Sequence, residues 1–538
     1  MLVVLALVSA ALGTAAAIQV MNGSLIAALC LVPYLGLLCA VWWFSRGNVL
    51  ILVLVAYLIA PSPADNLLPQ VFIFAGTDYG LRERDLVFLA DLVLLAALLI
   101  ARPPLPPGRL AKVWLGGLLL LAAYPIVVGL LIGAGQSVPA LIQGAIMPLR
   151  GIGIVVLVAW WARTRGWDDA VRDLGRTLVV CGAIVAATEV VLLLLAGGEL
   201  NFSLAGYPLV TDGRPAVPGW GNNILANLFC TCLATVTFIG HRFGWRLRWL
   251  VGLSALLLVG LAYTEVRIAM VVALILIEAP VVFAVVRRLW PRRGAIVALP
   301  SGGVFGVVLG LTSLTLLYKL NPRFSTLLPG IIERYVSGGD SAGSVVGDPS
   351  SGPDLGGASI STRGALIRAA LGVWERNPLL GTGWNGWGWA KSDASLGDFQ
   401  QVVGVDPHNG FMWLLADAGV LGVILLYLVP VILTFRRWDL WWLLAVPGVA
   451  TALEMVNPNL RNGHFAVLVW AFLALAFVAA PPPQRYTFRQ WFRDAWNWIR
   501  GREVQPPVAV ASTPSTRTEP ASAPVPATAQ PDVEAPAR

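Results

Sequence analysis

The sequence predicts an all-α polytopic membrane protein. Its 538 residues are 57% hydrophobic and 12% charged, whereas soluble domains average about 45–50% apolar and about 25% charged residues. The apolar residues fall in blocks long enough to cross a bilayer, for which about 20 residues are needed. These observations exclude a water-soluble enzyme and a secreted disulfide scaffold. The net charge of +8 does not indicate nucleic-acid binding, because the arginines are scattered between apolar blocks instead of clustered on one face.

Fourteen apolar segments follow one another along the chain, and we expect 12–14 transmembrane helices. The segments at 49–60 and 146–162 are short or interrupted by Gly and Pro, so each would also fit a re-entrant helix. The chain begins without a positively charged region or a convincing cleavage site, so we expect the first segment to be a retained helix. The predicted segments are 2–21, 25–44, 49–60, 86–100, 113–132, 146–162, 177–196, 222–240, 250–264, 268–286, 295–317, 409–434, 440–455 and 464–480.

The distribution of Arg and Lys predicts the orientation, because cytoplasmic loops retain positive charge. With the N-terminus inside, most basic residues of the short connections lie on the inner side, and both termini are cytoplasmic. The large loop at about 318–407 then lies outside the cell membrane. The short outer connections carry only Arg82, Arg84, Arg150, Arg214, Arg267 and Arg461.

The chain beyond the last apolar segment has a different character. Residues 484–502 place Phe488 and Trp491 on one helical face with arginines elsewhere, which predicts a helix on the inner membrane surface. A helix that binds a partner protein is the alternative. Residues 503–538 are rich in Pro, Ala, Ser and Thr, a composition typical of disorder. Residues 1–480 are the predicted transmembrane domain.

Two arginines on the predicted outer side are candidates for anion binding. Arg267 begins a helix after a very tight turn, and Arg214 lies shortly before the apolar segment at 222–240. A guanidinium group stays charged and presents a planar fork of donors that suits phosphate. For Arg267, a salt bridge with Glu265 is the alternative.

His408 is the candidate base among the three histidines. It lies where the outer loop becomes a helix, with Asp406 and Asn409 close in sequence. A neutral imidazole there would accept a proton from a hydroxyl at physiological pH. By contrast, we expect His241 to be solvated in a basic inner loop and His464 to cap or pack at the start of the last span.

The outer loop has an ordered part of its own. Residues 361–376, which include Arg363, read as a helix that Asn377 and Pro378 end. The following segment, PLLGTGWNGWGWA, contains a literal GxGxxG, but the flanking strand and helix of a dinucleotide site are missing. Anchoring at the membrane interface is favoured over stacking on sugar rings for Trp384, Trp387 and Trp389.

No sequence pattern predicts a metal or a cofactor. Walker A, HExxH and GxSxG sequences are missing, as is an outer DxD pair. The five cysteines all lie in apolar segments without a CxxC pattern, so we expect them to pack in the membrane domain.

With these residues identified, the sequence resembles the O-antigen ligase and O-antigen polymerase family of bacterial membrane glycosyltransferases. STRGALIRAALGVWERNPLLGTGWNGW and then PHNGFMWLLADAGVLGVILLY follow the family's order. Arg267 in TEVRIAM stands where the family's SRga helix begins, with Glu-Val in place of the common Thr-Ser. Arg214 with GWGNNILAN resembles the family's Arg-, Gly- and Asn-rich start of a helix. The resemblance covers about 200–480.

The resemblance implies a GT-C-type helical bundle in the bacterial inner membrane. It implies transfer of a glycan from an undecaprenyl-diphosphate-type carrier to a hydroxyl of a lipid, glycan or protein acceptor. His408 would be the base or the acceptor-orienting residue, Arg214 and Arg267 would hold the diphosphate, and Arg363 is a weaker match at the same site. Arginine would meet the charge of the leaving group without a metal, and one direct displacement would invert the anomeric centre.

A transporter or flippase for lipid-linked glycans is the alternative. In that case Arg214 and Arg267 would line a pathway and His408 would cap a helix. Transporters more often carry polar residues deep in several spans. Here that set is modest and comprises Asp91, Glu189, Glu278, Asp417 and Glu454. Ligase and polymerase activities are not separated by these residues.

Overall fold

The computed structural model describes the part of the chain that contains most of the predicted spans. The described residues are 105–132, 138–197, 199, 201–204, 207–211, 214–215, 222–264, 266–320, 357–387, 409–454 and 463–480. The first four predicted spans, the surface helix at 484–502, the tail at 503–538 and His408 lie outside them. Statements about the fold below concern the described residues.

The described residues are almost entirely helical, which confirms the predicted all-α polytopic class. Six helices are long and apolar enough to cross a membrane. The elements in chain order are α5 (Arg109–Ile132), α6 (Val138–Arg165), α7 (Trp167–Ala196), β1 (Phe202–Leu204), β2 (Tyr207–Thr211), β3 (Arg214–Pro215), α8 (Asn222–Ala234), a π-helix (Thr235–Gly240), α9 (Leu247–Thr264), α10 (Arg267–Leu320), α12 (Gly357–Arg376), α14 (Gly410–Arg436), a 3-10 turn (Trp438–Leu440), α15 (Trp441–Glu454) and α16 (Gly463–Val478).

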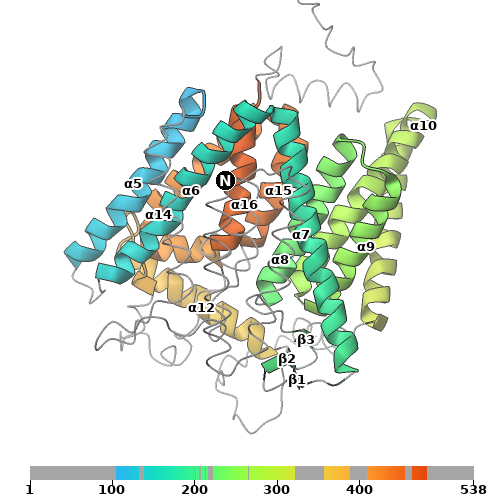
Figure 1. The fold of residues 1–538 in the computed structure, drawn as a ribbon, viewed down its shortest axis with the longest axis horizontal. Coiled ribbons are helices and arrows are strands. Elements are labelled where there is room, and N and C mark those ends of the chain that lie inside the picture. Colours follow the sequence, from blue (N-terminus) through green and yellow to red (C-terminus); the bar gives the residue numbers. More distant parts are fainter. Residues whose placement is uncertain are drawn as a thin grey trace, which may run out of the picture.

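The helices form one bundle around α16 (Figure 1). α16 packs on α6 and α15, with α5 and α14 on one side of the bundle and α7 to α10 on the other. Val467, Phe472 and Leu475 of α16 are fully buried. A helix that is apolar all round belongs in the interior of a bundle, so the sequence of α16 accounts for its central place.

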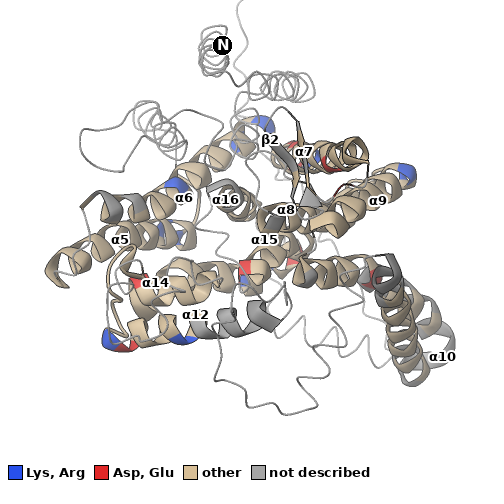
Figure 2. Cartoon of the chain, turned by 90° about the horizontal axis from the view of Figure 1, so that it is seen from below, with Lys and Arg blue, Asp and Glu red and all other residues tan. Residues whose placement is uncertain are grey.

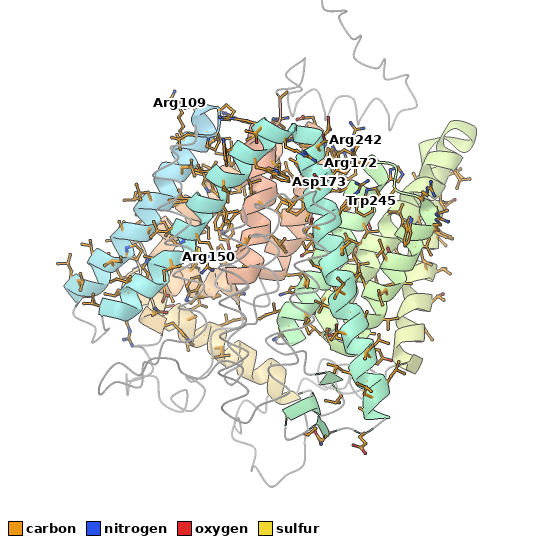
Figure 3. The ribbon with its side chains drawn as sticks, viewed as in Figure 1. Arg109, Arg150, Arg172, Asp173, Arg242 and Trp245 are labelled. Carbon is orange, nitrogen blue, oxygen red and sulfur yellow. The ribbon has the colours of Figure 1, made fainter. Side chains whose placement is uncertain are left out.

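The two ends of the bundle differ in charge and structure. Arg109, Arg172 and Arg242 lie at one end, which we call the basic end (Figure 3). The sheet β1 to β3 and α12 lie at the opposite end (Figure 1), which we call the α12 end. Seen from the α12 end, α12 runs alongside α14 (Figure 2). The predicted orientation, in which this basic end is cytoplasmic, stays a prediction.

α6 corrects two sequence-based expectations. Predicted as a short span at 146–162 or a re-entrant helix, it runs from Val138 to Arg165 over 28 residues, and Gly144–Arg165 is long enough to span a membrane. The prediction that Arg150 lies in an outer connection is also wrong, because Arg150 lies inside α6. Pro148 does not end the helix, so the interruption of the apolar pattern was misleading.

α10 consists of two antiparallel arms, although its helical assignment runs unbroken from Arg267 to Leu320. Gly302 lies against Val286, and Gly310 lies against Glu278. In a straight helix, residues 286 and 302 would be about 24 Å apart. The chain therefore doubles back between them, as the two predicted spans in this region require.

A small antiparallel sheet was not predicted. β1 pairs with β2, and β2 pairs with β3, where Thr211 faces Arg214. β2 and β3 contact α7, and β3 also contacts α9. The sheet thus holds the backbone of Arg214 at the α12 end.

The helices α7, α8 and α9 meet through small residues. A Cβ at Gly182 of α7 would lie 2.5 Å from Cys232 Sγ and 3.2 Å from Leu257 Cδ2. Cys181, Cys230 and Cys232 are free and buried, which confirms the packing role expected for these three cysteines. Small residues at helix contacts let membrane helices approach closely.

We expect Gly182→Val to lower the stability of the bundle by about 1–3 kcal/mol, because overpacking forces the three helices apart. Gly252→Val in α9 is the matched control, since a Cβ there meets nothing within 4 Å. Thermal unfolding in detergent measures both variants. Equal melting temperatures for the two would contradict the close packing at Gly182.

Candidate functional site

The predicted site residues lie on separate elements. Arg214 is in β3, Arg267 is the first residue of α10, and Arg363 is in α12. His408 lies outside the described residues, directly before Asn409, which is described. The sheet and α12 both lie at the α12 end of the bundle (Figure 1). The roles of the four residues remain predictions.

Four charged residues are buried among the described residues. Arg150 is 8% exposed, Glu454 is 2% exposed, and Glu189 and Asp417 are 0% exposed. They come from α6, α15, α7 and α14 respectively. Charged residues inside a membrane bundle are costly and commonly mark functional sites. The prediction of the outer site rested on loops and helix starts, and it did not single out Arg150 or Glu454.

Two of the buried charges, Arg150 and Asp417, lie deep within their helices. Arg150 is 13 residues from Arg163, which corresponds to about 20 Å along the helix. Asp417 is 19 residues from Arg436, or about 28 Å. Both residues therefore lie well away from the arginines that end these two helices. Figure 3 shows Arg150 well away from Arg109 and Arg172.

Glu189 is a buried carboxyl group without a hydrogen bond. Neither of its side-chain oxygens has a partner, and a Cβ at Gly260 of α9 would lie 3.0 Å from Glu189 Oε2. Arg267, which begins the next helix, follows Gly260 by seven residues in the chain. The buried carboxyl group of Glu189 therefore lies beside the C-terminal part of α9, shortly before Arg267 in the chain.

The start of α14 brings Glu454 to the backbone next to His408. Asn409 is the N-cap of α14, and its Oδ1 accepts a hydrogen bond from Met412 N at 3.0 Å. Such a cap satisfies one of the free amides at a helix start. The Glu454 carboxylate lies directly against Cα of Gly410, where a Cβ would overlap it. Glu454 thus contacts a residue, Gly410, that lies two positions after His408 in the chain, and only the fold reveals this.

α14 is broken in its N-terminal part. Gly419 has φ 61° and ψ −169°, so the helix consists of an outer half, 410–418, and an inner half, 420–436. A Cβ at Gly419 would lie within 2.5 Å of the carbonyl carbon of Leu379. Glycine is required here both for its positive φ and for the close approach of another backbone segment.

Residues 378–387, which we call the outer turn, fill this break. Thr382 N donates to Ala416 O at 3.0 Å, and Gly383 N donates to Asp417 O at 2.9 Å. On the other side of the break, Val420 N donates to Pro378 O at 3.0 Å. Leu421 N likewise donates to Leu379 O at 3.1 Å. The outer turn therefore satisfies backbone groups that the broken helix cannot satisfy itself.

The GxGxxG segment lies in this outer turn. A Cβ at Gly381 would lie 2.5 Å from Asp417 O, so the glycine permits contact between two backbones. This geometry agrees with the rejection of a dinucleotide site and gives the glycine a structural role.

The tryptophans of the outer turn correct another expectation. Trp384 is fully buried and Trp387 is 3% exposed, so neither is an interfacial anchor or an exposed platform for a sugar ring. Trp384 stacks on Trp413 of α14 with ring centroids 5.8 Å apart. Trp387 packs between α12 and α14. Trp389 lies outside the described residues.

The fold and these buried groups define a polytopic helical membrane protein that buries four charged residues among those the structure describes. Residues 252–427 match the family model described as O-antigen ligase. The resemblance predicted from the sequence is confirmed over this segment, which contains Arg267, Arg363 and His408 but not Arg214. The family indicates a glycan-transferring membrane enzyme of cell-envelope synthesis. A comparison with curated proteins gives no significant match.

Gly410→Ala tests the contact between α14 and Glu454. We expect it to lower the free energy of unfolding by about 1–3 kcal/mol, because the new methyl group must displace a buried carboxylate. Gly448→Ala in α15 is the control, since a Cβ there meets nothing within 4 Å. Thermal unfolding in detergent compares the two, and an unchanged melting temperature for Gly410→Ala would contradict the contact.

Proposed function

We propose that this protein transfers a glycan from an undecaprenyl-diphosphate-type lipid carrier to a hydroxyl acceptor at the outer face of the cytoplasmic membrane. The observation that carries the proposal is the match of residues 252–427 to the O-antigen ligase family, in a helical bundle that buries four charged residues among those described. The acceptor is a lipid, a glycan or a protein, and the fold is of the GT-C type.

The proposed reaction is a single displacement at the anomeric carbon. The acceptor oxygen forms a bond to this carbon as the bond to the diphosphate oxygen breaks. The hydroxyl proton passes to the imidazole of His408, which acts as the base. The lipid diphosphate leaves with the bonding electron pair, and the configuration at the anomeric carbon inverts.

Arginines stabilise the leaving diphosphate in this proposal. Arg214 and Arg267 are the assigned donors, with Arg363 at the face of α12. Fixed cations that meet developing negative charge lower the barrier most effectively in a site shielded from water. No metal is required by this mechanism.

The broken helix bears on the transporter alternative. In several transporters, broken helices expose backbone groups that bind the substrate. In the described structure, backbone groups on both sides of Gly419 bind the outer turn instead. The backbone groups at the break are therefore bound by the protein itself. This supports the transferase proposal over a substrate pathway through α14.

We expect His408→Ala to lower the transfer rate by about 10²–10⁴-fold, the usual contribution of a general base. The assay uses proteoliposomes with an undecaprenyl-diphosphate-linked glycan and a lipid or glycan acceptor, with products separated by mass. His241→Ala changes the same side chain near the basic end and should leave the rate unchanged. Full activity of a folded His408→Ala protein would disprove the base assignment.

Arg267→Lys tests whether a guanidinium fork is needed. Lysine keeps the charge but offers no planar pair of donors, so we expect the transfer rate to fall at least about tenfold. Added free diphosphate should also inhibit this variant less strongly than the wild type. Arg246→Lys, an exposed arginine near the basic end, is the matched control. If Arg267→Lys transfers as fast as the wild type, Arg267 has a structural role.

A further inference from the structure

We propose that Asp417 is a positioning residue, which fixes the outer turn and α12 against the outer half of α14. The inference rests on the proposed function, because the groups that it would place are His408 and Arg363. Asp417 itself does not face the reaction in this scheme. It acts through the backbone segments that it joins.

The Asp417 carboxylate holds the far end of the outer turn. Its Oδ2 accepts a hydrogen bond from Asn385 N at 2.9 Å, and its Oδ1 accepts one from Trp387 N at 3.0 Å. The side chain is fully buried. Hydrogen bonds from backbone amides to a carboxylate are charge-assisted and stronger than neutral ones. They extend the contact between turn and helix from Pro378 to Trp387.

The outer turn already has a neutral connection to α14. The backbone bonds on both sides of Gly419 involve residues 378–383 of the turn, and the hydroxyl of Thr382 donates to Ala416 O at 3.0 Å. A buried carboxylate adds a desolvation cost of several kcal/mol. We therefore infer that the Asp417 carboxylate offsets this cost by fixing the position of residues 385–387.

Trp387 carries this fixed position to α12. Its buried side chain packs in one cluster with Leu366 and Val373 of α12 and Ala416 of α14. Arg363 precedes Leu366 by three residues, which is about one helical turn. Asp417 thus binds the backbone amide of Trp387, and the side chain of Trp387 packs against α12, the helix that carries Arg363.

The same carboxylate lies on the half-helix that follows His408. The outer half of α14 begins at Gly410, after the Asn409 cap, and Asp417 is near its end. Trp413 of this half-helix stacks on Trp384 of the turn. The outer half of α14, the outer turn and α12 therefore form one unit. Within it, Asp417 links α14 to the outer turn.

The unit excludes the principal donor-binding arginines. Arg267 and Arg214 are on α10 and β3, which take no part in these contacts. Loosening the unit should therefore misplace His408 and Arg363, while Arg214 and Arg267 still bind the donor. Small displacements of a reacting group lower the rate steeply, so the expected effect is mainly on kcat, with only a small change in the donor KM.

The experiment compares Asp417→Asn with Asp439→Asn in the full-length protein. The two turn amides bond to different oxygens of Asp417, and asparagine replaces one of these oxygens with an NH2 group, so one of the two amides would face a donor. Asp439 also uses both oxygens, accepting from Arg437 Nε at 3.0 Å and Arg437 Nη2 at 2.9 Å, but near the basic end. Hydrogen exchange of the 382–387 amides and steady-state transfer kinetics are measured for each.

For Asp417→Asn we expect faster exchange of the turn amides, at least a tenfold lower kcat and a donor KM within about threefold of wild type. Asp439→Asn should match the wild type in both measurements. Thr382→Val, which removes one side-chain hydrogen bond to Ala416 O, should show a smaller loss of the same kind. It replaces Asp417→Asn if that protein does not insert.

Two results would overturn the inference: turn amides that stay protected in Asp417→Asn, or faster exchange with an unchanged kcat. A wild-type protein without transfer activity would contradict the proposed function instead. Hydrogen exchange would still decide whether Asp417 holds the turn.

Discussion

The break in α14 is the constraint on which the α12 end depends. A helix that crosses a membrane normally pairs its own backbone groups, because each unpaired group in hydrocarbon costs several kcal/mol. The left-handed conformation of Gly419 interrupts this pairing. The outer turn and the hydroxyl of Tyr124, which donates to Ala418 O, take up the groups beside the break. The place of the outer turn is therefore set by the helix.

This pairing explains why the outer turn is held against the helices. The outer turn supplies both donors and acceptors, so it behaves as part of the bundle and not as a surface loop. Trp384 fixes it further, since a Cβ at Gly144 of α6 would meet the Trp384 ring. A Cβ at Gly383 would also lie 2.6 Å from Gly129 Cα of α5. Glycine at 144 and 383 lets the turn sit close to both helices.

The sequence predicted the periodic and compositional features correctly. Apolar blocks predicted α5, α7 to α9 and α14 to α16, because burial in lipid requires long apolar helices. The end of α12 at Arg376 follows from Asn377 and Pro378. The pairing of the outer turn with α14 was not predictable, since it joins residues more than 30 positions apart and uses backbone atoms. The same holds for the contact between Glu454 and Gly410.

The sequence-based predictions were wrong where tertiary packing, and not local sequence, determines a residue's environment. Pro148 and the glycines near Arg150 read as an interruption, but α6 continues and buries the arginine. Trp384 and Trp387 read as interfacial, because tryptophan is enriched there, yet both pack in the interior. Hydropathy alone cannot tell a tryptophan that faces lipid from one that faces another helix.

The use of backbone groups within the chain constrains where a substrate could be bound. Because the groups beside Gly419 pair with the outer turn, α14 has little main chain to offer an anionic ligand at the break. In the proposed function, recognition of a diphosphate would then come from side chains such as Arg267, because a guanidinium group stays charged in a low-dielectric setting. Side chains held on separate rigid elements can match the charge of a leaving group as it develops. A rigid α12 end, fixed through a buried carboxylate, suits an enzyme that must align two substrates better than a pathway that must open and close.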